Sequence, residues 1–163
     1  MTRRVFYSFH YKPDNWRAAT VRQIGAIEGQ RVLNDNEWEK VAGRGDQAIS
    51  QWIDGQMYHK GCVVVLIGSA TAGRKWINYE IKKGWKDQKG VVGIHINKLL
   101  DRNQEQSRKG LNPFGGFNIG DKNMSQIVKC YDPPYLKSVD AYRYISDNIA
   151  AWVEEAIRIR QRH

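Results

Sequence analysis

The sequence predicts an α/β protein in which helices cover both faces of a parallel β-sheet. Short β-branched runs alternate along the chain with stretches of helical periodicity, which is the pattern of βαβ units. The run Cys62–Ile67 is apolar throughout, as is typical of a central parallel strand that is buried on both sides. The 163 residues are enough for one domain, 1–163, with a buried hydrophobic core.

The first part of the chain is expected to form a strand, a helix and a second strand. The first strand is Arg4–Phe9, and the helix begins at about Asn15 with Asp14 as its N-cap. A short second strand is expected at Gln30–Leu33. Three candidate core contacts come from this region: Trp16, Ile24 and Ile27.

The middle of the chain is expected to form one helix before the central strand and one helix after it. The first of these begins near Asp46, and its buried face follows the i, i+3, i+4, i+8 spacing through Ile49, Trp52, Ile53 and Met57. After the central strand, Gly68-Ser69-Ala70-Thr71 turns the chain into the next helix, which runs to about Trp85. The fourth strand is Val91–Ile96.

A long polar segment, Asn97–Asn123, separates the fourth strand from the rest of the chain. Irregular connections of this length are usually functional or disordered. Because Asn112-Pro113-Phe114 interrupts polar sequence, we expect this loop to lie near a ligand cleft or at a subunit contact, and Phe114→Ala to impair activity or assembly more than global stability. A fifth strand at about Gln126–Tyr131 and a last helix from about Val139 to Arg160 follow. The inward face of that helix carries Ile145, Ile149, Trp152, Val153, Ala156 and Ile157.

Five strands in this sequence order favour a flavodoxin-like, three-layer domain whose sheet has the strand order 2-1-3-4-5. In such sheets ligands bind beyond the carboxyl ends of the strands where the order reverses, here strands 1 and 3. The residues expected at that edge are Ser8–Tyr11 and Gly68–Trp76.

Several uses of this fold lack their sequence signatures here. There is no Gly-x-Gly-x-x-Gly after the first strand and no Gly-x-x-x-x-Gly-Lys-Ser/Thr, which excludes a Rossmann fingerprint and a P-loop. Ser8, Phe9 and Ser69 stand where a response regulator needs acidic residues. The four histidines are far apart in the sequence, so no metal site is expected.

The net charge of +9 raises the question of a nucleic-acid partner. The basic residues are scattered, and the densest cluster, Arg158, Arg160 and Arg162, falls at the end of the last helix, where the helix dipole favours cations. Nucleic-acid binding is therefore disfavoured, and a basic surface would equally attract an anionic dinucleotide.

The expected location is the cytoplasm. No apolar run approaches the roughly 20 residues that a membrane span needs, so no membrane partner is expected. Cys62 and Cys130 lie in apolar stretches without metal-like spacing, which indicates buried thiols in a reducing compartment.

The most informative pair of residues is Trp76 and Glu80. They are four apart and share one face of a helix that begins at the ligand-binding edge of the sheet. The alternative is that Glu80 only complements the helix dipole and that Trp76 is a core residue. The spacing alone leaves both interpretations open.

The chain resembles the TIR (Toll/interleukin-1 receptor-like) family over most of its first hundred residues. The similar segments are Val5–Phe9, Val32–Trp38, Cys62–Ser69 with the following Trp76 and Glu80, and Val91–Asn97. A narrower resemblance, to the TIR-like subunit of the Thoeris anti-phage defence system, rests on Arg4–Tyr11, Arg74–Ile81, Gly93–Asn97 and Gly110–Phe114. The hydrophilic loop between Asn36 and Asp46 differs from the assembly loop of receptor TIR domains, which counts against receptor-style adaptor assembly.

The resemblance implies an enzyme that cleaves the nicotinamide–ribose bond of NAD⁺ and makes a cyclic ADP-ribose isomer. That product would act as a second messenger and activate a separate effector protein. NAD⁺ would be a substrate and not a cofactor, and a homo-oligomer is left open. Glu80 is expected to be the catalytic carboxylate, because the transition state is oxocarbenium-like and a nearby carboxylate stabilises its positive charge.

The substrate-binding residues expected around Glu80 are Ser8, Phe9, His10, Ser69 and Trp76. The rings would stack on or enclose the substrate and the serines would bond ribose or phosphate. The alternatives are that the aromatic residues are core and the serines form turns. Two other functions stay open: a catalytically silent TIR-like interaction module, and a nucleoside-type transferase or hydrolase that uses the same glutamate.

Overall fold

A computed structural model describes residues 2–163. The helices are α1 (Tyr11–Arg22), α2 (Asp35–Ala42), α3 (Asp46–Met57), α4 (Lys75–Lys86) and α5 (Ser138–Gln161). The strands are β1 (Arg3–Ser8), β2 (Ile27–Gly29), β3 (Cys62–Ile67), β4 (Gly90–His95), β5 (Asn118–Ile119), β6 (Lys122–Asn123) and β7 (Cys130–Tyr131). Two 3-10 turns, η1 (Pro113–Gly116) and η2 (Met124–Gln126), lie between β4 and β7.

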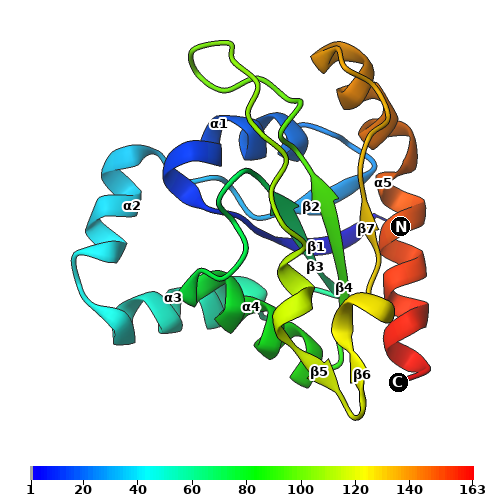
Figure 1. The fold of residues 1–163 in the computed structure, drawn as a ribbon. Coiled ribbons are helices and arrows are strands. Elements are labelled where there is room, and N and C mark those ends of the chain that lie inside the picture. Colours follow the sequence, from blue (N-terminus) through cyan, green and yellow to red (C-terminus); the bar gives the residue numbers. More distant parts are fainter. Residues whose placement is uncertain (1) are drawn as a thin grey trace.

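The main sheet is parallel throughout, with the order β2-β1-β3-β4-β7 (Figure 1). The predicted flavodoxin-like order 2-1-3-4-5 is thereby confirmed, with β7 as the fifth strand. At the centre β3 is buried at every position, as its unbroken apolar sequence predicts. Since β1 and β3 are neighbours whose connections leave toward opposite edges, their carboxyl ends form the switch point of the sheet.

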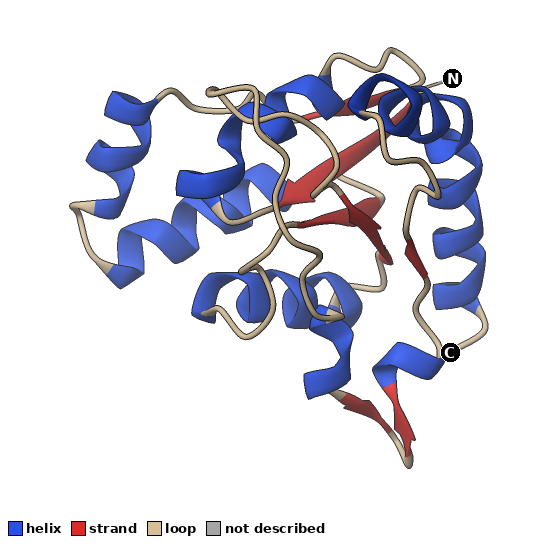
Figure 2. Cartoon of the chain, turned by 45° about the horizontal axis from the view of Figure 1, so that its top comes forward, coloured by secondary structure: helices blue, strands red, loops and turns tan. Residues whose placement is uncertain are grey.

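Helices cover both faces of the sheet (Figures 1 and 2), and each face has its own hydrophobic core. One core joins the sheet to α1 and α5, and the other joins it to α3 and α4. Along β1 the side chains alternate, so Tyr7 enters the first core and Phe6 the second. By the same alternation Ser8 lies on the face that α4 covers.

Two early elements differ from their predicted bounds. The helix α1 begins at Tyr11, with His10 at its N-cap, so Asp14 lies inside the first turn and not at the cap. Asp14 is buried and paired with Arg17, while Trp16 is half exposed and not a core residue. The second strand is Ile27–Gly29, earlier than expected.

The side chain of Gln30 explains why the second strand ends early. Its amide oxygen accepts from the backbone N–H of Tyr7 at 2.8 Å, and its amide nitrogen donates to the carbonyl of Tyr7 at 2.8 Å. A side-chain amide therefore replaces the backbone ladder at the edge of β1. Both partners are buried, so the bonds are well shielded from water.

Helix α2 was not predicted, because its residues were interpreted as part of a hydrophilic loop. Its N-terminus is a capping box in which Asn34 accepts from the backbone N–H of Glu37 and Glu37 accepts from that of Asn34. None of its residues is fully buried, so the helix carries no strong hydrophobic period. The Asn-x-x-Glu pattern was the available signal.

The segment between β4 and α5 is folded, with a short β5–β6 hairpin that projects from the body of the molecule (Figure 2). Phe114 has no exposed surface and packs in the second core, so its side chain is a core residue, and the place of the loop at a subunit contact stays a prediction. The chain crosses the sheet edge at Gly110, where a Cβ would lie 2.0 Å from the carbonyl oxygen of Gly68. The fifth strand is only Cys130–Tyr131, the last two residues of the predicted range, while its first residue, Gln126, belongs to η2.

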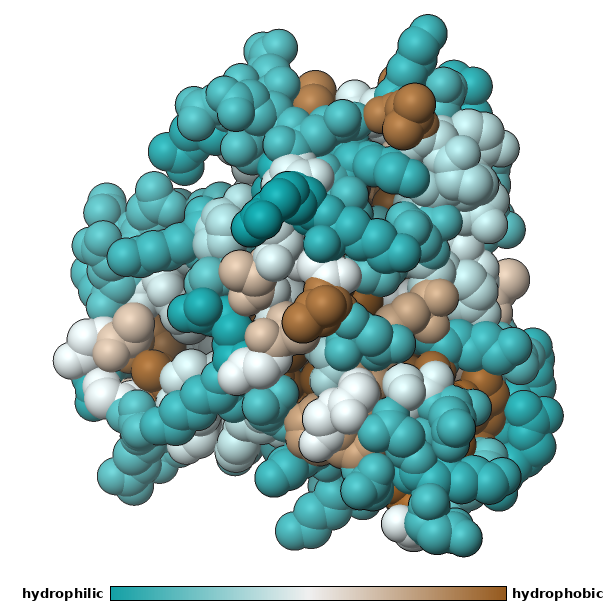
Figure 3. Space-filling model, in the orientation of Figure 1, coloured by the Kyte–Doolittle hydropathy of each residue, from teal (hydrophilic) through white to brown (hydrophobic). Residues whose placement is uncertain are grey.

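Hydrophilic residues cover most of the face seen in Figure 3, with apolar side chains in small separate groups. Within residues 2–163 no helix combines the length and the apolar character needed to cross a bilayer.

Candidate active site

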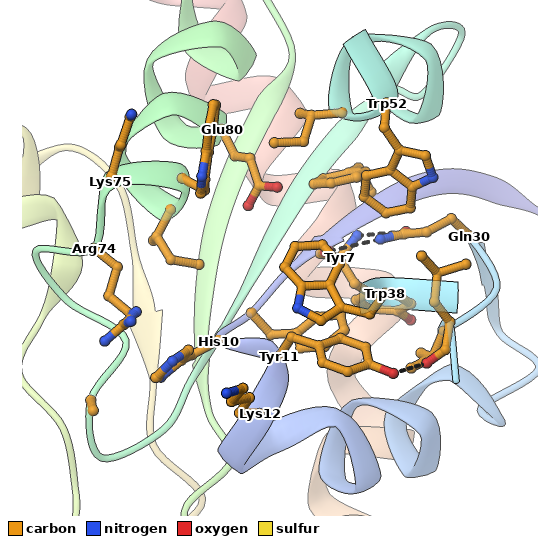
Figure 4. A pocket seen from close by; sticks show the side chains of 18 of the residues that line it. Tyr7, His10, Tyr11, Lys12, Gln30, Trp38, Trp52, Arg74, Lys75 and Glu80 are labelled. Atoms are coloured by element: carbon orange, nitrogen blue, oxygen red, sulfur yellow. Dashed lines mark hydrogen bonds between the residues drawn. The ribbon is translucent and has the colours of Figure 1, made fainter. Parts of the chain in front are cut away.

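A cavity of about 710 Å³ opens at the carboxyl end of β1 (Figure 4). This volume is in the usual range of ligand pockets, roughly 300–1,000 Å³. Its walls come from the end of β1, the loop between β3 and α4, the starts of α1 and α4, the chain after β2, and the helices α2 and α3, which contribute Trp38, Trp52 and Ile53. The cavity therefore occupies the predicted switch point.

Glu80 lies on α4 with its carboxylate directed into this cavity (Figure 4). Only 6% of the residue is exposed, because Ile77 and Ile81 hold this face of α4 against the sheet. Ser8 Oγ donates a hydrogen bond of 2.5 Å to Glu80 Oε1. Helix α4 and strand β1 together therefore fix the position of the carboxylate.

Burial raises the pKa of Glu80 from its ordinary value of 4.5 to about 8, and the hydrogen bond from Ser8 opposes that rise. Among the described residues no cation pairs with this carboxylate in a salt bridge. Burial in the free protein therefore favours the neutral acid form of Glu80. A cation brought close to it would favour the ionised form.

Aromatic rings form the wall of the cavity that faces Glu80. Phe9 stacks on Tyr11 with ring centroids 6.1 Å apart, Tyr11 stacks on Trp38 at 5.1 Å, and Trp52 meets Trp38 edge-on at 6.4 Å. The hydroxyl of Tyr11 donates to the carbonyl of Leu33, which ties α1 to the chain before α2. Such a wall offers flat surfaces for planar rings.

Four of the six predicted site residues line the cavity: Phe9, His10, Trp76 and Glu80. The other two do not. Ser8 is fully buried beneath Glu80 and supports it, while Ser69 is exposed outside the lining. The turn after β3 is instead held by Thr71, whose hydroxyl accepts from the backbone N–H of Gly68.

Three lining residues, Gln30, Trp38 and Trp52, were not expected at the site, whereas Tyr11 belongs to the segment Ser8–Tyr11 that was expected at this edge. Trp52 was assigned to the core and Trp38 to a loop. Recognising the capping box would have placed Trp38 on a helix, but only the packing of α2 on α3 brings its ring to the cavity.

A flavodoxin-like parallel sheet with a buried glutamate on α4, four residues after a cavity-lining tryptophan, defines a TIR-like α/β protein. The family model described as Thoeris protein ThsB, TIR-like domain, matches residues 6–101, and the chain belongs to this family. A protein of Bacillus cereus (strain MSX-D12), named as a candidate cyclic ADP-D-ribose synthase, ThsB1, is 34% identical over 119 residues. The match covers 70% of this chain and 62% of the length of that relative.

Proposed function

We propose that this protein cleaves the nicotinamide–ribose bond of NAD⁺ and closes the remaining nucleotide into a cyclic ADP-ribose isomer. The product would act as a second messenger on a separate effector protein in anti-phage defence. The observation that carries the proposal is the buried carboxylate of Glu80 in an aromatic cavity at the switch point. The name of the Bacillus cereus relative supports the same reaction.

The proposed chemistry needs one carboxylate. Bond cleavage sends the C–N electron pair to the nicotinamide nitrogen, which is already cationic and leaves as a neutral ring. Positive charge develops on the ribose, and ionised Glu80 stabilises it. A nucleophile from the adenosine half then attacks the anomeric carbon and loses its proton, which closes the ring. Water in its place would give linear ADP-ribose.

The raised pKa of Glu80 fits a substrate-dependent ionisation. In the free protein burial favours the neutral acid, and the cationic nicotinamide ring of bound NAD⁺ would favour the carboxylate. The same burial is the observation that favours the second candidate, a catalytically silent interaction module in which Glu80 serves only as a hydrogen-bond acceptor for Ser8. The two candidates differ in whether NAD⁺ is consumed.

The direct test is to incubate the purified protein with NAD⁺ and to analyse the products by chromatography and mass. A cyclic product that accumulates with released nicotinamide supports the proposal. Intact NAD⁺ at high protein concentration would favour the silent module, and cleavage of a free nucleoside in preference to NAD⁺ would favour a nucleoside hydrolase.

Ser8→Ala is expected to move the pH dependence of NAD⁺ turnover to higher pH. The hydroxyl favours the ionised form of Glu80, so its loss leaves burial unopposed and raises the pKa of Glu80 further. We expect turnover to fall by about tenfold at pH 7, the lower end of the effect of one hydrogen bond to a charged group, and to recover at pH 9. Ser8→Thr, which keeps the hydroxyl, is the control. A uniform loss at every pH would mean that Ser8 acts only on packing.

Trp76→Ala or Phe9→Ala is expected to shift the product from cyclic nucleotide toward linear ADP-ribose. Both side chains are partly buried and line the cavity, where they would hold the adenine end near the anomeric carbon and exclude water. Intramolecular attack gains from such proximity, by roughly 7–11 kcal/mol in the best model reactions. The measurement is the cyclic-to-linear ratio at matched NAD⁺ consumption. An unchanged ratio in both variants would assign these rings to packing.

A further inference from the structure

Four basic side chains line the cavity, and their pairing divides them into two kinds. Arg31 is paired with Glu37 through two hydrogen bonds, and Lys75 is paired with Asp46. Lys12 and Arg74 line the same cavity but form no salt bridge with an acid among residues 2–163. The positive charge of these two residues is therefore available to a ligand.

Lys12 and Arg74 lie on either side of His10 (Figure 4). Burial and the positive charges of Arg74 and Lys12 together lower the pKa of His10, which indicates that the three groups share one electropositive region. The Nδ1 atom of His10 is buried without a hydrogen-bond partner. An anion placed between these groups would offset the charge that they concentrate here.

The backbone at this rim of the cavity, formed by His10, Lys12 and Arg74, also contributes a positive electrostatic potential. His10 is the N-cap of α1 and Arg74 is the N-cap of α4, and neither helix has a side-chain cap. Both 12-residue helices therefore direct backbone N–H groups and the positive ends of their dipoles toward the rim. This adds to the two unpaired cations, since helix N-termini favour phosphate oxygens.

We infer that Lys12, Arg74 and His10 form a subsite for the diphosphate of a dinucleotide. The inference rests on the proposed function, because it assigns the phosphate end of the same substrate. Arg74 is the N-cap of α4 and Glu80 lies in the second turn of this helix, and both side chains line the same cavity. A diphosphate held beside Arg74 would therefore leave the attached nicotinamide ribose in the part of the cavity that contains Glu80.

The test is binding of ADP, inorganic pyrophosphate and adenosine to the whole protein, measured by calorimetry. Lys12→Gln and Arg74→Gln are each expected to weaken ADP binding by about tenfold, the effect of losing one charge-assisted hydrogen bond. Adenosine binding should not change. Arg31→Gln and Lys75→Gln are the matched controls, because these cations line the same cavity but are already paired, and we expect less than about twofold from each.

The outcomes separate the subsite from the proposed function. Both unpaired cations are exposed, so the variants should unfold at the wild-type temperature. Equal losses in all four variants, or none, would overturn the subsite even if the protein turns over NAD⁺. Pyrophosphate that binds as tightly as ADP would assign the site to a free inorganic anion and overturn the nucleotide assignment. Selective loss of ADP binding in a protein that leaves NAD⁺ intact would support the subsite and contradict the proposed reaction.

Discussion

Replacing Glu80 with glutamine is expected to reduce NAD⁺ turnover by at least about 10²–10³-fold, the range seen when one electrostatic stabiliser of a transition state is removed. Glutamine keeps the shape of the side chain and can still accept the hydrogen bond from Ser8. It carries no charge, so it cannot stabilise an oxocarbenium ion. The measurement is nicotinamide release at pH 7 and at pH 9. Turnover that survives at both pH values would remove Glu80 from the mechanism.

The same substitution is expected to stabilise the fold at alkaline pH. The folded-state pKa of Glu80, about 8, lies above its ordinary value of 4.5. Its contribution to the free energy of unfolding is therefore complete below pH 4.5 and is lost as the pH rises through 8. Glutamine has no such dependence, so the variant should gain on the wild type over this window, by on the order of a few kcal/mol.

Urea unfolding at pH 5 and pH 9 measures this gain. A more stable but inactive Glu80→Gln protein at pH 9 would show that the fold carries a buried carboxylate at a cost in stability, as functional sites do. A variant less stable than the wild type at pH 9 would mean that the ionised carboxylate has a partner in the fold, contrary to the burial effect described above.

Arg17→Leu is expected to destabilise the protein by about 3–5 kcal/mol, the cost of removing one partner of a buried ion pair. Arg17 is 3% exposed, and its guanidinium bonds Asp14 at 2.8 Å. It also donates to the carbonyls of Leu99 and Glu105, each at 2.8 Å. A third acceptor is the carbonyl of Pro13, at 3.2 Å. The substitution leaves a buried carboxylate and three carbonyl groups without their donor, and it releases the chain after β4 from α1.

Arg3→Leu is the matched control, because Arg3 forms an equally short pair with Glu154 on the exposed surface. Exposed pairs contribute little to stability, so we expect the two variants to differ clearly in their urea midpoints. Adding Asp14→Asn to Arg17→Leu should recover part of the loss, since it removes the uncompensated charge. Equal midpoints for Arg17→Leu and Arg3→Leu would contradict this account of the buried pair.

The sequence by itself determined the sheet and its order. The apolar run Cys62–Ile67 matches β3 residue for residue, and the i, i+3, i+4 spacing predicted α3, where Ile49, Ile53 and Met57 are buried. A hydrophobic pattern shows which positions of a segment are buried, so it can be interpreted without knowing which other segment packs against it. The placement of Glu80 at the switch-point edge followed from the same reasoning and agrees with the cavity.

Features that depend on a side-chain partner elsewhere in the fold could not be predicted from the local hydrophobic pattern. The second strand ends early because the amide of Gln30 bonds the backbone of Tyr7, which is 23 residues away. Asp14 has the residue type of a helix cap, and only its burial beside Arg17 makes it half of an ion pair. An aspartate at this position is compatible both with a helix cap and with a buried ion pair, so the sequence could not distinguish the two roles.

The tertiary structure alone decided how the site is assembled. Ser8 was expected to touch substrate, and it instead holds Glu80 from 72 residues away. Trp38 reaches the cavity because α2, which has no buried residue of its own, packs on α3. Which cations of the cavity are free depends on where Glu37 and Asp46 lie. Each of these features depends on a contact between segments that are remote in sequence, whereas the local hydrophobic pattern shows only whether a position is buried.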